Sequence, residues 1–161
     1  MRSGKVSAAR IMKYIVLAAI VGFVVLLMLF ASGSSKPFEE VAKPVRASLD
    51  TTVLAEQDAS GLKRNFGLNA SDYSGVMYYS AESNISAEEV LLIKVKREDQ
   101  IQQVLDAVGD RIETRKRDFE GYLPEELQLL EDARQSVRGT YIFYVSSSKA
   151  DDYFNTFSTS L

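Results

Sequence analysis

A long run of apolar residues near the N-terminus is the strongest pattern along the chain. Tyr14–Ala31 are 18 consecutive residues without a charge. As an α-helix this segment would be about 27 Å long, which is close to the thickness of the hydrocarbon core of a bilayer. It is apolar on every side, whereas a helix in a protein core keeps a polar face. The pattern therefore predicts a transmembrane helix over Tyr14–Ala31, with the lipid bilayer as its partner.

The charges on either side of this segment predict its orientation. Four basic residues and no acidic residue precede it, and all 22 acidic residues of the chain follow it. Positively charged flanks stay in the cytoplasm. We therefore expect residues 1–13 to be a cytoplasmic tail, 14–31 a single-pass anchor in the cell membrane, 32–37 a linker, and 38–161 an extracytoplasmic domain.

A cleaved secretory signal is the alternative interpretation of the same segment. Signal peptides have an apolar core of about 7–15 residues, followed by small residues at the cleavage site. The run Ala31-Ser32-Gly33 offers such a site, and processing after Gly33 would release the domain. The length of the apolar run favours a retained anchor.

Beyond the linker, stretches with helical periodicity alternate with stretches typical of strands. Apolar residues at spacings of three and four predict helices over residues 38–49, 98–119 and 150–160. A short helix is expected from Asp58 to Phe66, because Asp58 is a good N-cap and Gly67 a good stop. Pro124 and the acids that follow it predict a further helix to about Asp132.

Four strands are predicted between these helices. They are Gly75–Ser80, Val90–Lys96, Ser136-Val137 and Thr140–Val145, the last two joined by a hairpin turn at Arg138-Gly139. Two hairpins connected through helices predict an α+β fold. We expect a four-stranded, largely antiparallel sheet with helices packed on one face.

Composition narrows the functions that this domain can have. The chain has 161 residues, is 46% hydrophobic and 25% charged, and so leaves enough sequence after the linker for one ordinary globular domain. Five of the 19 basic residues precede Phe38, which leaves 14 basic against 22 acidic residues in the domain, a net charge of −8. Such a domain repels phosphate backbones, so nucleic acid is not an expected partner.

The chain contains no Cys, no His and no Trp. Disulfides, thiolate nucleophiles, Ser-His-Asp triads and imidazole metal ligands are therefore excluded. We expect no catalytic residue, no metal site and no cofactor. Carboxylates remain as candidate catalytic groups, because glycosidases work with two of them.

The most promising interaction surface combines tyrosines with acids. Its candidate residues are Tyr78, Tyr79, Glu82, Glu88, Glu89 and Tyr122. Tyrosines on a sheet face suit a sugar, a peptide or a partner protein, but strand tyrosines also fill sheet faces beneath helices. The acids could hold Ca²⁺, yet their spacing matches no calcium loop, and a solvated strand edge is the simpler interpretation.

Three segments together resemble a known bacterial family. They are Glu88–Lys96 (EEVLLIKVK), Arg111 through Phe119-Glu120-Gly121-Tyr122-Leu123-Pro124, and Arg138–Ser146 (RGTYIFYVS), and the step Asn65–Leu68 is also similar. Their order and spacing resemble domain of unknown function 4358. The resemblance implies a small domain outside the cytoplasmic membrane of Gram-positive bacteria, without an assigned activity and near cell-envelope acylation machinery. Relatives look like lipoproteins, whereas this chain has no cysteine for a lipid.

We therefore expect a non-enzymatic accessory or adaptor at the cell envelope, whose partner is an envelope protein or a cell-wall polymer. One alternative is a small hydrolase or transferase with two close, buried carboxylates. Another is a sensor for a small ligand. The shape of the surface at the loop Glu82–Glu88 distinguishes them, because a flat acidic surface favours the adaptor and a pocket favours a ligand-binding function.

Overall fold

The computed structural model describes the backbone of residues 8–31 and 35–161, and the side chains of residues 12–24 and 35–161. The chain divides into two compact units, Met1–Ser32 and Gly33–Leu161. Residues 1–7 of the expected tail, residues 32–34 of the expected linker and the cleavage position after Gly33 lie outside the described residues.

The described residues of the N-terminal unit form a single helix. Helix α1 spans Ala8–Ala31 and is 24 residues long, which confirms a helix over the apolar run. Its described apolar side chains are exposed, including Ile15, Leu17 and Phe23. Within the part of the chain that the structure describes, no helix has the length and hydropathy needed to cross a membrane. Insertion of Tyr14–Ala31 into a bilayer therefore stays a prediction.

The second unit is built around a five-stranded sheet in the order β1-β2-β3-β5-β4, in which all neighbouring strands are antiparallel. The strands are β1 (Leu54–Glu56), β2 (Gly75–Ala81), β3 (Glu89–Lys94), β4 (Arg134–Arg138) and β5 (Tyr141–Ser146). The four predicted strands and the hairpin are present. The α+β class is confirmed, but the prediction of four strands was wrong.

The strand that sequence reasoning missed is β1. It has three residues and lies at the edge of the sheet, where Leu54 is opposite Ala81 and Glu56 is opposite Tyr79. Three residues are too few to show the alternation that distinguishes a strand. Its position depends on the hydrogen bonds that β2 offers and on burial of Leu54, which is 1% exposed.

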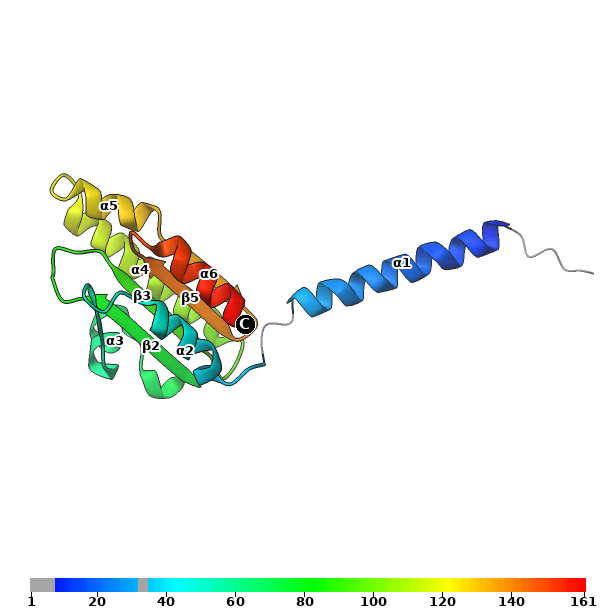
Figure 1. Cartoon of the computed structure of the whole chain (residues 1–161), viewed down its shortest axis with the longest axis horizontal. Helices are drawn as coiled ribbons and strands as arrows, with labels where there is room; N and C mark the ends of the chain where they lie inside the picture. The colour runs from blue at the N-terminus through cyan, green and yellow to red at the C-terminus, as the bar shows by residue number, and fades with distance from the viewer. Residues whose placement is uncertain (1–7, 32–34) are drawn as a thin grey trace, which may run out of the picture. The chain divides into compact units, whose positions relative to one another are not determined.

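Helices cover both faces of the sheet, which corrects the prediction of one covered face (Figure 1). Val90 and Leu92 of β3 lie in one hydrophobic cluster, and Leu91 and Ile93 lie in the other. Because successive strand residues point to opposite faces, a strand that is apolar throughout needs cover on both. The helices are α2 (Phe38–Ser48) and α6 (Ala150–Ser160) on the first face, and α3 (Ala59–Phe66) and α4 (Gln100–Phe119) on the second.

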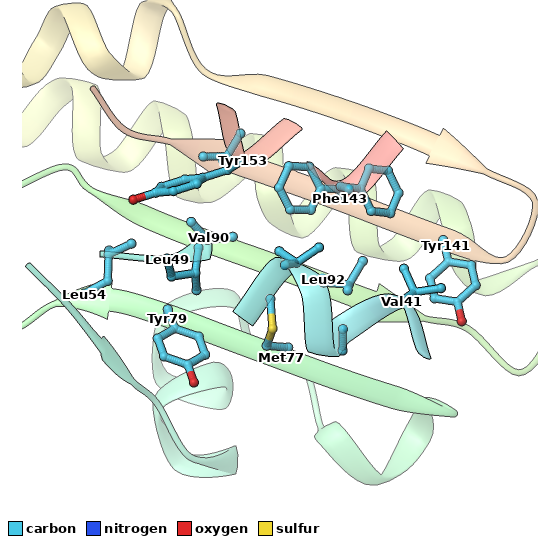
Figure 2. Close-up of a cluster of buried hydrophobic side chains, with 14 of the residues drawn as sticks. Val41, Leu49, Leu54, Met77, Tyr79, Val90, Leu92, Tyr141, Phe143 and Tyr153 are labelled. Atoms are coloured by element: carbon cyan, nitrogen blue, oxygen red, sulfur yellow. The ribbon is translucent and has the colours of Figure 1, made fainter. Parts of the chain in front are cut away.

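The cluster under α2 and α6 is dense in large side chains (Figure 2). Phe143 of β5 stacks on Phe157 of α6 with ring centroids 4.7 Å apart. In the same cluster, Met77 and Leu92 from neighbouring strands lie beneath α2. This face is filled by packing and leaves its tyrosines no open surface.

The ends of the helices follow the local sequence. The Asp58 carboxylate accepts a hydrogen bond from the Gly61 amide at 2.8 Å and so caps α3, and Gly67 ends α3 with a φ of 70°. A further short helix, α5 (Pro124–Glu131), has Pro124 in its first turn. It forms a third small cluster in which Leu130 packs with Phe119 at the end of α4.

The two ends of the sheet differ in what they contact. At one end, which we call the entrance end, Tyr141 and Lys94 donate hydrogen bonds to the Lys36 carbonyl at 2.8 and 2.7 Å, so the chain joins the domain there. At the other end, the loop end, Glu89 lies between Ser80 and Ser146. The five residue steps along β3 separate the two ends by about 17 Å.

Candidate functional site

Glu89 is a carboxylate buried at the loop end of the sheet. It is the first residue of β3, is 3% exposed, and lies on the face covered by α3 and α4. The Tyr78 hydroxyl donates to its Oε2 at 3.0 Å, and the Tyr144 hydroxyl donates to its Oε1 at 3.2 Å. Both tyrosines come from the strands on either side of β3, so the sheet itself supplies these two donors.

Arg111 of α4 completes the environment of this carboxylate. Its Nε lies 3.3 Å from Oε1 of Glu89, and its Nη2 lies 3.3 Å from Oε2. The guanidinium also lies over the Phe66 ring of α3, 5.9 Å from its centroid. Burial acts to lower the pKa of Arg111, but the Glu89 carboxylate raises it, and the net effect is a raised pKa.

The two tyrosines are held in their neutral form. Burial, followed by the negative charge of Glu89, raises the pKa of Tyr78 to about 12 and that of Tyr144 well above its ordinary value. Asn65 of α3 donates to the Tyr78 hydroxyl at 2.7 Å, which leaves the tyrosine proton for Glu89. Asn65, Tyr78, Glu89 and Arg111 therefore form one connected polar network from α3 to α4.

A cavity of about 390 Å³ opens beside this network. We call it the loop-end cavity. It lies between α3, the end of β2, the loop 82–88 and α4. Its lining residues are Gln57, Arg64, Asn65, Ser80, Ala81, Glu82, Ser83, Asn84, Ser86, Ala87, Glu88, Glu89, Arg111 and Arg115. The lining is almost entirely polar, which is unusual for a small-molecule site and favours a polar ligand.

The loop that forms one wall of the cavity is tied to the helices. Arg115 of α4 donates from Nη2 to the carbonyl groups of Asn84 and Ser86 at 3.0 and 2.9 Å. Its guanidinium lies 4.2 Å from the centroid of the Phe119 ring. The Ala87 amide donates to Glu126 of α5 at 2.6 Å. These contacts hold the loop over the cavity in a defined position.

The structure places the predicted interaction residues in three different environments. Glu82, Glu88 and Glu89 line the loop-end cavity, and the Tyr78 hydroxyl lies directly behind it on Glu89. Tyr79 is 5% exposed and belongs to the cluster on the opposite face, under α2 and α6. Tyr122 is 74% exposed after α4, and it is not among the residues that line the cavity.

The described residues therefore form no open face of tyrosines. Tyr78 is 1% exposed, and Tyr141 and Tyr144 are fully buried. These strand tyrosines fill the space beneath the helices, which was the simpler of the two interpretations of the sequence. The three acids are brought together with groups that the sequence analysis did not select.

The missed residues of the site are Arg64, Asn65, Arg111 and Arg115. One signal in the sequence does point to two of them. Arg111 and Arg115 continue the spacing of the buried residues Val104 and Val108 along α4, so both lie toward the covered side of that helix. An arginine on the apolar side of a helix needs a partner, and its partner here is 22 residues away in sequence.

The geometry limits the chemistry that these acids can perform. Both oxygens of Glu89 accept hydrogen bonds, and Glu88 accepts from Ser148 Oγ at 3.0 Å and from Ser147 Oγ at 3.3 Å. A glycosidase places two carboxylates on either side of the bond that it cleaves. Among the described residues, no group of three acidic side chains is arranged to hold a metal ion.

Comparison with known protein families identifies the family of this chain. The model of the family described as "Domain of unknown function (DUF4358)" matches residues 47–147. The chain belongs to this family. The match spans all five strands and every residue that lines the loop-end cavity, so the site lies within the segment that defines the family. Comparisons with curated proteins and with solved structures gave no match.

Proposed function

We propose that this protein is a membrane-tethered, non-enzymatic accessory domain of the cell envelope, which recognises a small polar ligand or an exposed polar group of a partner in the loop-end cavity. The observation that carries the proposal is the cavity itself, which lies over the buried Glu89–Arg111 pair. A flat acidic surface at Glu82–Glu88 would have favoured a simple adaptor. A cavity there favours recognition of a ligand.

The site has the rigidity that a binding site needs. Glu89 and Arg111 are fixed by the network of hydrogen bonds behind the cavity, and Arg115 holds the loop in front of it. A preorganised site loses little conformational entropy when a ligand binds. A binding role explains why a costly buried ion pair lies at the base of a cavity and not in a hydrophobic cluster.

The place of the cavity within the domain also supports this proposal. The chain joins the domain at the entrance end of the sheet, through the Lys36 carbonyl, and the cavity lies at the loop end. Within the domain, the cavity thus lies at the end opposite Lys36, and none of its lining residues belongs to the segment that enters the domain.

Anchoring and orientation are part of the same proposal. They are supported by the uncharged run over Tyr14–Ala31 and by the basic residues that precede it. A reporter that is active only outside the cytoplasm, fused after Leu161, is expected to be active in intact cells. Activity only of a cytoplasmic reporter at the same position would contradict the orientation.

Site-specific crosslinking tests the binding site. A photo-crosslinking amino acid at Ser83, which is exposed and lines the cavity, is expected to form an adduct in intact cells. The same probe at Ser158, an exposed serine of α6, is the matched control and should form none. Mass spectrometry would measure both adducts.

A third variant separates binding in the cavity from contact with the loop surface. Ser80 lies on the same strand face as Tyr78 and lines the cavity, so Ser80→Trp is expected to fill the cavity and abolish the Ser83 adduct. An adduct that persists in Ser80→Trp, or that forms equally from Ser158, would contradict recognition in the cavity.

A further inference from the structure

We infer that the loop-end cavity binds an oxyanion, a carboxylate or a phosphate group, through the guanidinium groups of Arg64 and Arg111. This inference rests on the proposed binding function and specifies the chemistry of the ligand. It follows from the N–H groups of the arginines in the cavity, some of which already have a hydrogen-bond partner whereas others do not.

Arg111 has donors that its internal partner does not occupy. Its Nε and Nη2 contact Glu89, whereas its Nη1 has no hydrogen-bond partner among the described residues. Three side-chain atoms of the described residues are both fully buried and unpaired: Arg46 Nε, Tyr73 Oη and Ser146 Oγ. The unpaired Nη1 of Arg111 is not one of them, so solvent reaches it. Arg111 therefore presents N–H groups to the cavity while Glu89 fixes the plane of its guanidinium.

Arg64 is the second cation of the cavity. It lies in the last turn of α3, is exposed, and makes no ion pair or hydrogen bond through its side chain within the described part of the chain. Arginine presents a planar fork of donors that matches the two oxygens of a carboxylate or a phosphate. A fixed arginine at the base and a free one on the wall suit a ligand that enters with its anionic group first.

The charged residues that line the cavity balance one another, although the domain as a whole is acidic. The cavity contains three arginines and three glutamates, so it is formally neutral within a domain of charge −8. Glu89 is paired with Arg111, and Glu88 is held by Ser147 and Ser148. Of the three acids, only Glu82 is exposed and lacks a partner among the described residues.

Size and lining narrow the ligand further. A volume of about 390 Å³ is within the range of small-molecule sites and would hold a small molecule or the end of a polymer. No aromatic ring is among the lining residues, so the cavity lacks the stacking surface that sugar rings use. Polar, charge-assisted contacts to an oxyanion are the strongest interactions that the lining can form.

Titration with simple anions tests the inference. The full chain in an uncharged detergent would be titrated with sodium acetate or inorganic phosphate at constant ionic strength. Nuclear magnetic resonance would monitor the Nε–H signals of the arginines. We expect saturable shifts of the Arg64 and Arg111 signals, and the anion that gives the tighter binding distinguishes a carboxylate ligand from a phosphate ligand.

Matched variants distinguish a site from general electrostatic attraction. Arg64→Gln is expected to weaken anion binding about tenfold, since it removes a charge-assisted contact. Lys63→Gln removes the same charge from a neighbouring exposed position that does not line the cavity, and it should leave the affinity nearly unchanged. Glu82→Gln should tighten binding, because it removes a negative charge from the cavity.

Two results would overturn the oxyanion inference. They are the absence of a saturable shift with either anion, and equal weakening in Arg64→Gln and Lys63→Gln. Neither result contradicts the proposed binding function if the Ser83 crosslink still forms and Ser80→Trp still blocks it. Conversely, saturable anion binding without a crosslink would retain the site and contradict the envelope partner.

Discussion

Arg111 contacts both carboxylate oxygens of Glu89, with its Nε 3.3 Å from Oε1 and its Nη2 3.3 Å from Oε2. The arginine side chain is 18% exposed and the glutamate 3%. Removing two charges from water costs free energy that their attraction repays only when the geometry and the surrounding hydrogen bonds are good. Here Tyr78 and Tyr144 supply additional donors to Glu89, so the protein solvates both oxygens of the carboxylate.

Breaking this pair should destabilise the domain strongly. Arg111→Gln is expected to lower the free energy of unfolding by about 3 kcal/mol, because it leaves the buried Glu89 charge without its counter-ion. The double variant Glu89→Gln/Arg111→Gln should recover more than half of this loss. Urea unfolding of the full chain in an uncharged detergent, followed by circular dichroism, would measure both. A double variant with the summed loss of the two single variants would contradict the coupling.

Tyr78, which donates to the same carboxylate, should contribute less to the stability of the domain than Arg111 does. Tyr78→Phe removes the donor to Glu89 and the acceptor for Asn65. It retains the ring, whose centroid lies 5.2 Å from that of the Phe66 ring. We expect a loss of about 1–3 kcal/mol in the free energy of unfolding, as for a buried polar group left without its partner. Tyr122→Phe changes an exposed hydroxyl and should have almost no effect. Equal effects would show that Tyr78 makes no special contribution.

Two glycines should respond to alanine in opposite directions. A Cβ on Gly75 would clash with the Phe38 ring, so Gly75→Ala must displace the ring that begins α2 and should lower the thermal midpoint. Gly109 in the middle of α4 has no atom within 4 Å of an added Cβ. Gly109→Ala should stabilise the helix by about 0.8–1 kcal/mol. Thermal unfolding of both variants measures the contrast, and a tolerated Gly75→Ala would contradict the close contact with Phe38.

Alkaline pH should destabilise the domain through its buried tyrosines. The pKa of Tyr78 is raised from 10.0 to about 12 in the folded state, so the folded protein holds this proton more tightly than the unfolded chain does. The resulting stabilisation is fully present below pH 10 and is lost as the pH rises from 10 to about 12. Thermal midpoints should fall over this range, and the fall should be smaller in Tyr78→Phe. Ionisation of Tyr78 near pH 10 in a still-folded protein, seen in its ultraviolet absorbance, would contradict this prediction.

Most of the elements in this domain could be predicted because their signals are local. The Asp58 cap, the Gly67 stop and the Pro124 start act on the backbone within a few residues, and all three occur as expected. The spacing of Val104 and Val108 predicts α4 in the same way. Among the strands of the described residues, only β1 was missed, because three residues are too few to show a period and its pairing depends on a neighbouring strand.

The site depends on contacts that no local pattern encodes. The sequence singled out Glu82, Glu88 and Glu89 as neighbours along one segment, but it did not indicate that Arg64 and Arg111 line the same cavity. Tyr78 and Tyr79 are adjacent in sequence, yet one contacts Glu89 and the other packs under the helices of the opposite face. Only the layers of the fold separate their environments.

For this chain, residue order predicted most of the helices and the four longer strands of the sheet. It also established the family. Tertiary packing places α3 and α4 on one face of the sheet and α2 and α6 on the other. The Glu89–Arg111 pair depends on this arrangement. Backbone preferences act over a few residues, whereas the choice of which helix covers which face depends on burying the apolar surface of all elements together.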